Sequence, residues 1–121
     1  ERFFMDELIF DMEILMTSAD GDRLWAEELF DIFINDTQDR MEKMGSLLES
    51  RDRTEIRRHI HTIKGAAGSI GALTVKRSAY EMELLAVSGD YEGFRSKMIM
   101  LKNELDMLRS AFETEFRKGS K

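Results

Sequence analysis

A chain of 121 residues, 42% apolar and 35% charged, is long enough for one packed domain and too apolar to stay disordered. Its net charge of -6 provides no bulk attraction to nucleic acid or anionic lipid, so we expect neither a nucleic acid partner nor direct membrane contact. The absence of Cys excludes disulfides, thiolate metal sites and thiol nucleophiles. We expect a cytoplasmic protein. A longer, membrane-anchored protein of which this chain is a cytoplasmic part stays open as an alternative.

The chain lacks Pro, has 8 Gly and is rich in straight-chain residues, a composition that favours helix throughout. Apolar residues at three- and four-residue steps predict five helices. The first is an accessory helix over 1–18 whose apolar line is Phe4, Leu8, Met12 and Leu15. The second begins at an N-cap formed by Asp20 or Asp22 and ends near Ser50.

The later helices are marked by their caps. Asp52 and Glu55 have the spacing of a capping box, in which Asp52 accepts from a backbone N–H and Glu55 reaches back. Gly71 is the expected C-cap of this third helix, and Asp90 is the expected N-cap of the fifth. The apolar lines of helices three to five are Ile56, Ile60, Ile63 and Ala67; Val75, Ala79, Met82 and Ala86; and Phe94, Met98, Leu101, Leu105, Leu108 and Phe112.

Short connections between long amphipathic helices are typical of an up-and-down bundle. We therefore expect an all-α single domain: a four-helix bundle over 20–118, the short accessory helix packed across an end or side, and residues 119–121 as an appended tail. Because the chain starts without Met, we expect it to be a module of a longer protein. Helical spacing favours core packing, rather than a promiscuous groove or membrane contact, for the nine Met and for Phe3, Phe4, Phe30 and Phe33.

A candidate site lies on the third predicted helix, in the segment His61-Thr62-Ile63-Lys64-Gly65. At about 100° per residue, His61 points about 130° away from the core line of this helix and therefore outward, beside the core seam. His59 points the other way, and we interpret it as a structural residue at the edge of the core. The two histidines cannot ligate one metal ion together. Five residues lie within about 60° of His61 on its face: Arg57, Arg58, Lys64, Gly65 and Gly68.

The two glycines on the His61 face need an explanation, because Gly inside a helix costs about 1 kcal/mol relative to Ala. We interpret them as clearance for the backbone of another protein approaching the imidazole. Lys64, one turn away, can place an ammonium near an anionic group on that ring. Together these features favour a nucleophilic histidine that accepts a phosphoryl group.

The segment from His61 to Ala72 resembles the signature of histidine phosphotransfer (HPt) domains, His-x-Leu-Lys-Gly followed by a Gly-Ala pair. Further matches follow at the spacing of that family: Val75, Ala79 and Met82-Glu83. Mild departures from the family pattern occur at Ile63, Ser69-Ile70 and Met82. The resemblance covers residues 20–90 well. The last helix agrees with the family only in the pattern of its apolar residues.

This resemblance implies a function and a site. His61 would be the phosphoacceptor, attacking the aspartyl phosphate of a receiver domain, and Lys64 would stabilise the phosphoryl oxygens. Gly65 and Gly68 would let the receiver dock closely. The implied role is a relay between His61 and response-regulator receivers in a multistep phosphorelay, as a module of a hybrid sensor histidine kinase. Such a domain has no ATP-binding or kinase activity and no cofactor of its own, since magnesium belongs to the partner receiver. A monomer is expected.

Further residues are assigned to receiver docking. Arg57 and Arg58 form, with Lys64, a local basic cluster suited to an acidic receiver pocket. Ile60 is assigned as an apolar neighbour of the same face. The plain alternative for the cluster is a solvated basic helix face.

Two other functions stay open. One is a non-catalytic helical bundle used only for docking. The other is a phosphotransfer domain of the chemotaxis-kinase type, which is disfavoured because that branch usually has a second histidine where this sequence reads Ala79-Tyr80-Glu81-Met82-Glu83. A dimerisation domain of a sensor kinase is rejected, since Thr62 rather than a carboxylate follows His61 and no Pro is present.

Overall fold

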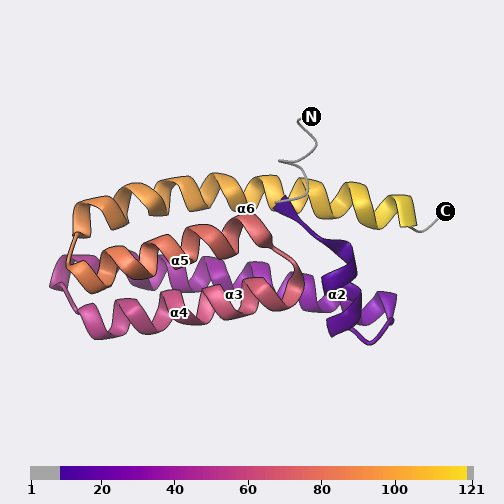
Figure 1. The fold of residues 1–121 in the computed structure, drawn as a ribbon, viewed down its shortest axis with the longest axis horizontal. Helices are drawn as coiled ribbons and strands as arrows, with labels where there is room; N and C mark the ends of the chain where they lie inside the picture. The colour runs from indigo at the N-terminus through magenta and orange to yellow at the C-terminus, as the bar shows by residue number, and fades with distance from the viewer. Residues whose placement is uncertain (1–8, 120–121) are drawn as a thin grey trace.

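A computed structural model describes residues 9–119 of the chain, with side chains from 9 to 116. The helices of this range, labelled as in Figure 1, are α2 (Met12–Ser18), α3 (Arg23–Ser50), α4 (Arg53–Ile70), α5 (Leu73–Ser88) and α6 (Tyr91–Gly119). No strand occurs among the described residues, so the predicted all-α fold is confirmed. None of these helices is long and apolar enough to cross a bilayer.

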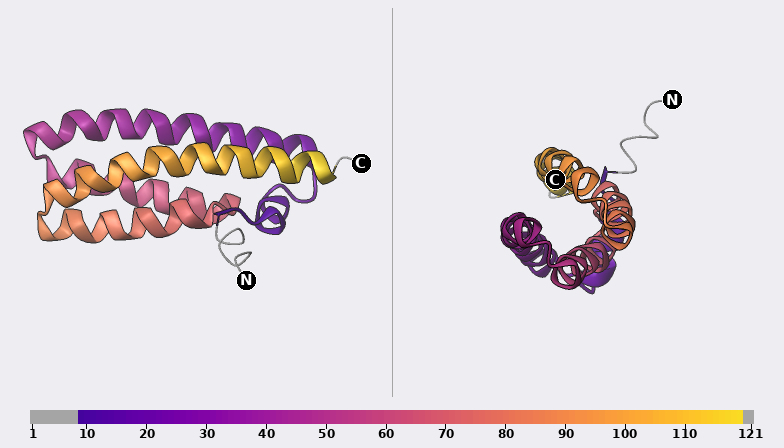
Figure 2. Two further views of the ribbon diagram at one scale, coloured as in Figure 1. Left: turned by 90° about the horizontal axis from the view of Figure 1, so that it is seen from above. Right: turned by 90° about the vertical axis from the view of Figure 1, so that its left-hand side faces the viewer.

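The four long helices run up and down, each antiparallel to the next (Figure 1). Viewed along the bundle axis they form an arc, in which α4 and α5 lie between α3 and α6 (Figure 2). Between the two ends of the arc, α3 and α6, runs a groove of about 820 Å³ with Met41, Leu48, Met98 and Leu105 among its lining residues. The short helix α2 contacts α3, α4 and α6 at one end of the bundle, as expected for the accessory helix.

The core consists of the predicted apolar lines. Every line residue named above on α4 and α5 is buried, and on α6 only Met98 is half-buried. Phe30 and Phe33 are buried as predicted, whereas Phe3 and Phe4 lie outside the described residues. Core packing is confirmed for Met41, Met44 and Met82; in contrast, Met100 and Met107 are exposed on α6.

An aromatic cluster closes the bundle at the end where α2 packs. The rings of Phe30 on α3 and Phe112 on α6 stack at 3.9 Å between centroids. Phe10 meets both rings edge-on, at 6.1 and 5.8 Å. Arg23 holds the same end from α3, with its guanidinium 4.0 Å from the ring centre of Phe116. These contacts join α3 to α6 at this end of the bundle.

The predicted first helix differs from the structure. Phe4 and Leu8 lie outside the described residues, and the backbone at Phe10 and Asp11 is not helical, so a continuous helix over 1–18 is wrong. Asp11 is extended (φ -121°, ψ 104°), and its side chain caps α2. Its N–H donates to the carbonyl of Gly71 at 2.9 Å, a tertiary bond that replaces the intrahelical one.

The other caps follow the sequence closely. Asp22 accepts from the Trp25 N–H, Asp52 from the Glu55 N–H and Asp90 from the Gly93 N–H. Gly71 ends α4 in the left-handed region, at φ 79°. Only the second half of the capping box is wrong: the N–H of Asp52 donates to the Leu47 carbonyl, and the Glu55 carboxylate pairs with Arg58.

Candidate functional site

The site is built on the outer face of α4, at about the middle of the helix. Ile60 and Ile63 are fully buried in the core, which fixes the rotation of the helix. His61 consequently points away from the core, and 68% of its side chain is exposed. The predicted outward orientation of His61 is confirmed.

A carboxylate from the neighbouring helix α5 contacts both predicted catalytic residues. The Oε2 atom of Glu83 lies 3.0 Å from Nδ1 of His61, and Oε1 lies 2.6 Å from Nζ of Lys64. The side chain of Glu83 is only 18% exposed, because it lies in the seam between the two helices. Glu83 therefore fixes the relative positions of the imidazole and the ammonium.

These contacts determine the charge state of Glu83 and the tautomer of His61. The hydrogen bond from Lys64 and then that from His61 lower the pKa of Glu83, against the opposing effect of burial. Glu83 is therefore a carboxylate at neutral pH and can only accept hydrogen bonds. The Nδ1 atom of His61 must then carry the proton, and in the neutral ring Nε2 keeps a free lone pair.

Lys64 is less exposed than His61, at 27% of its side chain. Besides its bond to Glu83, its ammonium lies 5.6 Å from the ring centre of Tyr80, a cation–π contact with a second residue of α5. One of the three N–H donors of Lys64 is directed to Glu83. The ammonium is thus held one helical turn from His61, and its other N–H donors can bind a further acceptor.

The two glycines of the face have different surroundings. A Cβ added to Gly65 would have nothing within 4 Å, so no contact within the described chain demands glycine there. A Cβ added to Gly68 would meet the side chain of Lys76, with atoms at 3.5 to 3.7 Å. Lys76 of α5 thus lies across Gly68, and the space above that glycine is already partly used by the domain itself.

The remaining predicted docking residues are not equally placed. Arg57 and Arg58 are exposed on the outer face of α4, as expected. The charge of Arg58 is paired with Glu55, and that of Lys64 with Glu83, so the local basic cluster is weaker than the sequence suggests. The assignment of Ile60 to the docking surface is wrong, because this side chain is fully buried on the core side of α4.

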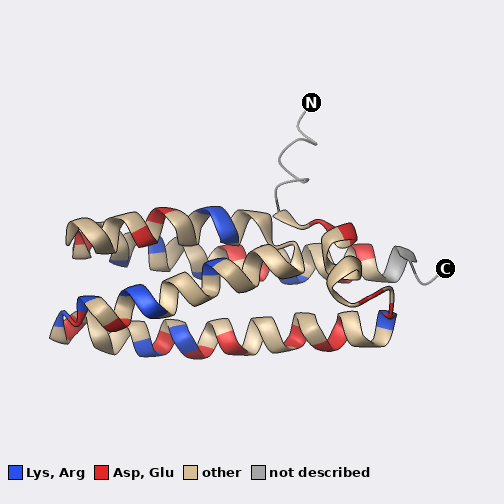
Figure 3. Ribbon diagram, turned by 60° about the horizontal axis from the view of Figure 1, so that its bottom comes forward, with Lys and Arg blue, Asp and Glu red and all other residues tan. Residues whose placement is uncertain are grey.

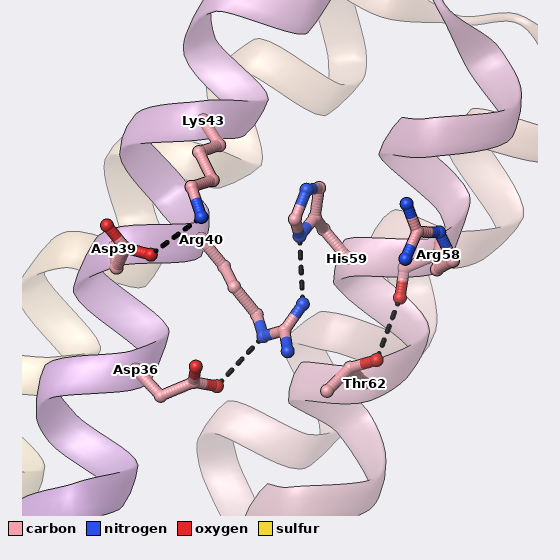
Figure 4. A network of polar contacts seen from close by, with 7 residues as sticks. All are labelled: Asp36, Asp39, Arg40, Lys43, Arg58, His59 and Thr62. Atoms are coloured by element: carbon pink, nitrogen blue, oxygen red, sulfur yellow. Dashed lines mark hydrogen bonds and ion pairs between the residues drawn. The ribbon is translucent and has the colours of Figure 1, made fainter.

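His59 lies at the edge of the core, as predicted, in the seam between α4 and α3. Arg40 of α3 is placed between two partners: its Nε is 2.8 Å from Asp36 and its Nη1 is 2.9 Å from Nδ1 of His59 (Figure 4). Burial first, and then the nearby Arg40, Arg58 and Lys43, lower the pKa of His59. This ring is therefore neutral at pH 7 and accepts from Arg40.

Charge is distributed unevenly around the site. Acidic residues recur along α3, whereas Arg and Lys gather on α4 (Figure 3). Among the described residues, no group of three or more His, Cys, Asp or Glu could hold a metal ion.

Sequence reasoning missed the role of Glu83 and the position of Lys76. In the sequence, Glu83 is identified only as part of the family pattern, because a separation of 22 residues from His61 does not by itself predict a contact. One feature of the sequence could have indicated the contact: Glu83, in the Met82-Glu83 pair, is a carboxylate on the helix that follows the histidine helix. Lys76 belongs to none of the sequence motifs described above, so its position over Gly68 could not be predicted.

Comparison with known proteins agrees with the fold of a helical bundle. The Hpt domain family model matches residues 28–111. The chain belongs to the Hpt domain family, the histidine-containing phosphotransfer domains. A curated protein from Dictyostelium discoideum, phosphorelay intermediate protein rdeA, is 26% identical over 97 residues, which are 80% of this chain and 38% of that protein. The chain thus spans well under half the length of this relative.

Solved structures show the same fold at low sequence identity. The histidine-containing phosphotransfer protein HptB from Pseudomonas aeruginosa PAO1 superposes with a TM-score of 0.79 at 21% identity, covering 91% of this chain and 96% of that one. The maize phosphotransfer protein ZmHP2 gives 0.77 at 21% identity, covering 96% and 94%. The HPT domain of a sensor hybrid histidine kinase from Shewanella gives 0.69 at 21% identity, covering 91% and 95%.

Proposed function

We propose that this domain accepts a phosphoryl group on His61 from the aspartyl phosphate of one receiver domain and passes it to the aspartate of another. The observation that carries this assignment is the 3.0 Å contact between Nδ1 of His61 and Glu83. It leaves Nε2 as the nucleophilic atom on a ring that is 68% exposed. A partner can therefore reach the reacting atom without any rearrangement of the bundle.

The transfer step uses groups that are already in place. The Nε2 lone pair of His61 attacks the phosphorus, the P–N bond forms, and the P–O bond to the receiver aspartate breaks to release its carboxylate. The ring gains positive charge while Nδ1 keeps its proton, and the carboxylate of Glu83 stabilises that charge. The reverse step, onto a second aspartate, restores the neutral ring.

Lys64 and the glycines serve the same transfer. The free donors of Lys64 stabilise the phosphoryl oxygens as charge builds on them. Gly65 leaves room for the receiver backbone, and the exposed Arg57 and Arg58 contribute positive charge at the rim. The domain itself needs no cofactor, and magnesium belongs to the receiver.

The relatives support a place in a phosphorelay. One is named a phosphorelay intermediate, and another is a domain of a sensor hybrid histidine kinase. We assign this chain as a monomeric module of a hybrid sensor kinase, acting in the cytoplasm and exchanging phosphate with response-regulator receivers. An isolated monomer exposes its single nucleophile to either receiver.

The test is transfer of radiolabelled phosphate to the chain from a panel of kinase-phosphorylated receiver domains. His61→Gln removes the nucleophile, and His59→Gln is the matched control, since it removes a histidine two positions away that faces α3. We expect base-stable, acid-labile label on the wild type and on His59→Gln, and none on His61→Gln.

Two results would contradict the proposal. Label that persists on His61→Gln would place the chemistry elsewhere. A wild-type chain that binds a receiver but takes label neither from it nor from phosphoramidate would be a docking bundle without transfer activity.

A further inference from the structure

Helix α5 carries an exposed apolar face beside the His61 site. Tyr80 and Leu84 are each 52% exposed and Val87 is 47% exposed. Their steps of four and three residues place them on one side of the helix, opposite its buried line. One turn before Tyr80, Lys76 extends the same side with a positive charge. We call these four residues the α5 strip.

The α5 strip is continuous with the site on α4. The side chain of Lys76 lies over Gly68, and the ring of Tyr80 lies 5.6 Å from the ammonium of Lys64. At the far end, Arg53 of α4 donates to the carbonyl of Val87 at 3.5 Å. The strip therefore runs beside the His61 face, with contacts to α4 at Lys76, Tyr80 and Val87.

The composition of the α5 strip indicates a protein partner. Half-exposed Tyr, Leu and Val side chains in a row form the apolar centre that protein interfaces bury. The ammonium of Lys76 has no hydrogen-bond or ion-pair partner within the described residues, unlike that of Lys64. An unpaired cation next to an apolar row suits a surface that presents carboxylates near apolar side chains.

We propose that the receiver docks across both helices, with the α5 strip supplying the apolar contact and Lys76 facing the acidic rim of the receiver's phosphoryl site. This inference rests on the proposed function. It adds α5 to a docking surface whose individually predicted residues all lie on α4. Gly68 then has two roles: it leaves room for the side chain of Lys76, and it lets the receiver come close to α4.

The test is the rate of phosphoryl transfer to the full chain as a function of receiver concentration, with whichever receiver of the panel labels the wild type. The strip variants are Lys76→Glu and Leu84→Ser. The matched controls are Arg77→Glu, the same charge change one position along α5, and Met107→Ser, a side chain of similar exposure on α6 (50%, against 52% for Leu84).

We expect each strip variant to raise the half-saturating receiver concentration by about fivefold or more, with a change of less than about twofold in the saturated rate. The controls should change neither. Strip variants that match their controls while the wild type transfers would overturn the docking role of α5 and leave the proposed function intact. If phosphoramidate labels the wild type but no receiver does, the proposed function is contradicted. The docking role of the α5 strip, which rests on that function, is then contradicted as well.

Discussion

At the scale of single residues, the chemistry of the site depends on Glu83. Its two oxygens contact an imidazole and an ammonium at 3.0 and 2.6 Å, so one side chain sets both the tautomer of His61 and the position of Lys64. A helical wheel can place His61 outward, because that follows from the period of one helix. It cannot place Glu83 beside it, because the register between α4 and α5 is set by packing in the core.

Replacing Glu83 by Ala should slow receiver-dependent transfer about tenfold, because the positive charge that develops on the ring loses its carboxylate. The ring should also lose its preference for a proton on Nδ1. Transfer kinetics and ¹⁵N chemical shifts of the His61 ring measure the two effects. Glu81→Ala is the control, since Glu81 lies on the same helix and pairs with Lys97. Unchanged kinetics and tautomer in Glu83→Ala would refute the role.

His59 should make stability depend on pH. Its pKa in the folded state lies below the ordinary value of 6.5, through burial and then the charge of Arg40. As the pH falls from 6.5 through that lowered pKa, the unfolded chain binds a proton that the folded chain resists, and stability is lost. We expect His59→Gln to flatten this part of the profile in urea denaturation between pH 7.5 and 5. A variant that keeps the wild-type slope would exclude His59 as its source.

At the scale of elements, local signals account for most helix ends, and a tertiary contact accounts for the exception. Asp22, Asp52 and Asp90 were predictable as caps because each bonds to a backbone N–H three residues ahead. The break at Asp11 was not, because it depends on the carbonyl of Gly71, 60 residues further along the chain.

The turn between α4 and α5 should be intolerant of a side chain at Gly71. A Cβ there would lie 2.3 Å from the carbonyl oxygen of Asp11, in addition to the strain of φ 79°. Gly21 has nearly the same φ, 78°, but nothing within 4 Å. We expect Gly21→Ala to cost about 1 kcal/mol and Gly71→Ala about 2–4 kcal/mol of unfolding free energy. Equal losses in chemical denaturation would mean that the Asp11 contact does not constrain the turn.

Helix α4 should gain stability and lose function when Gly65 becomes Ala. Apart from the backbone of α4 itself and the two neighbouring residues, no atom of the described chain lies within 4 Å of the added Cβ, so the change should stabilise the domain by about 0.5–1 kcal/mol. The same methyl group should slow transfer from a receiver by obstructing its approach. Gly45 on α3 also has space for a Cβ, with nothing within 4 Å, so Gly45→Ala should stabilise the domain by a similar amount without slowing transfer. Equal transfer rates in the two variants would contradict clearance as the reason for Gly65.

At the scale of the whole molecule, the bundle was predictable from amphipathic helices joined by short turns. The arc of α3 to α6 and the groove between its ends were not, because they depend on how far the two outer helices approach each other. Phe30 and Phe112 stack at one end of this pair, and the groove lies along its other half. The His61 face is on α4, one of the two helices in the middle of the arc (Figure 2).

The exposure of His61 also has a consequence for the lifetime of the phosphorylated state. A phosphoryl group on Nε2 would be exposed to water, and the carboxylate of Glu83 contacts the opposite side of the ring, where it cannot activate a water molecule for attack. We expect the label to decay within about threefold of the rate in a proteolytic peptide, since the ring is open to water and Glu83 cannot activate a water molecule for attack. Decay tenfold faster in the intact domain would reveal a built-in phosphatase activity. Otherwise the domain stores phosphate until a receiver removes it, and how long the signal lasts is decided by its partners.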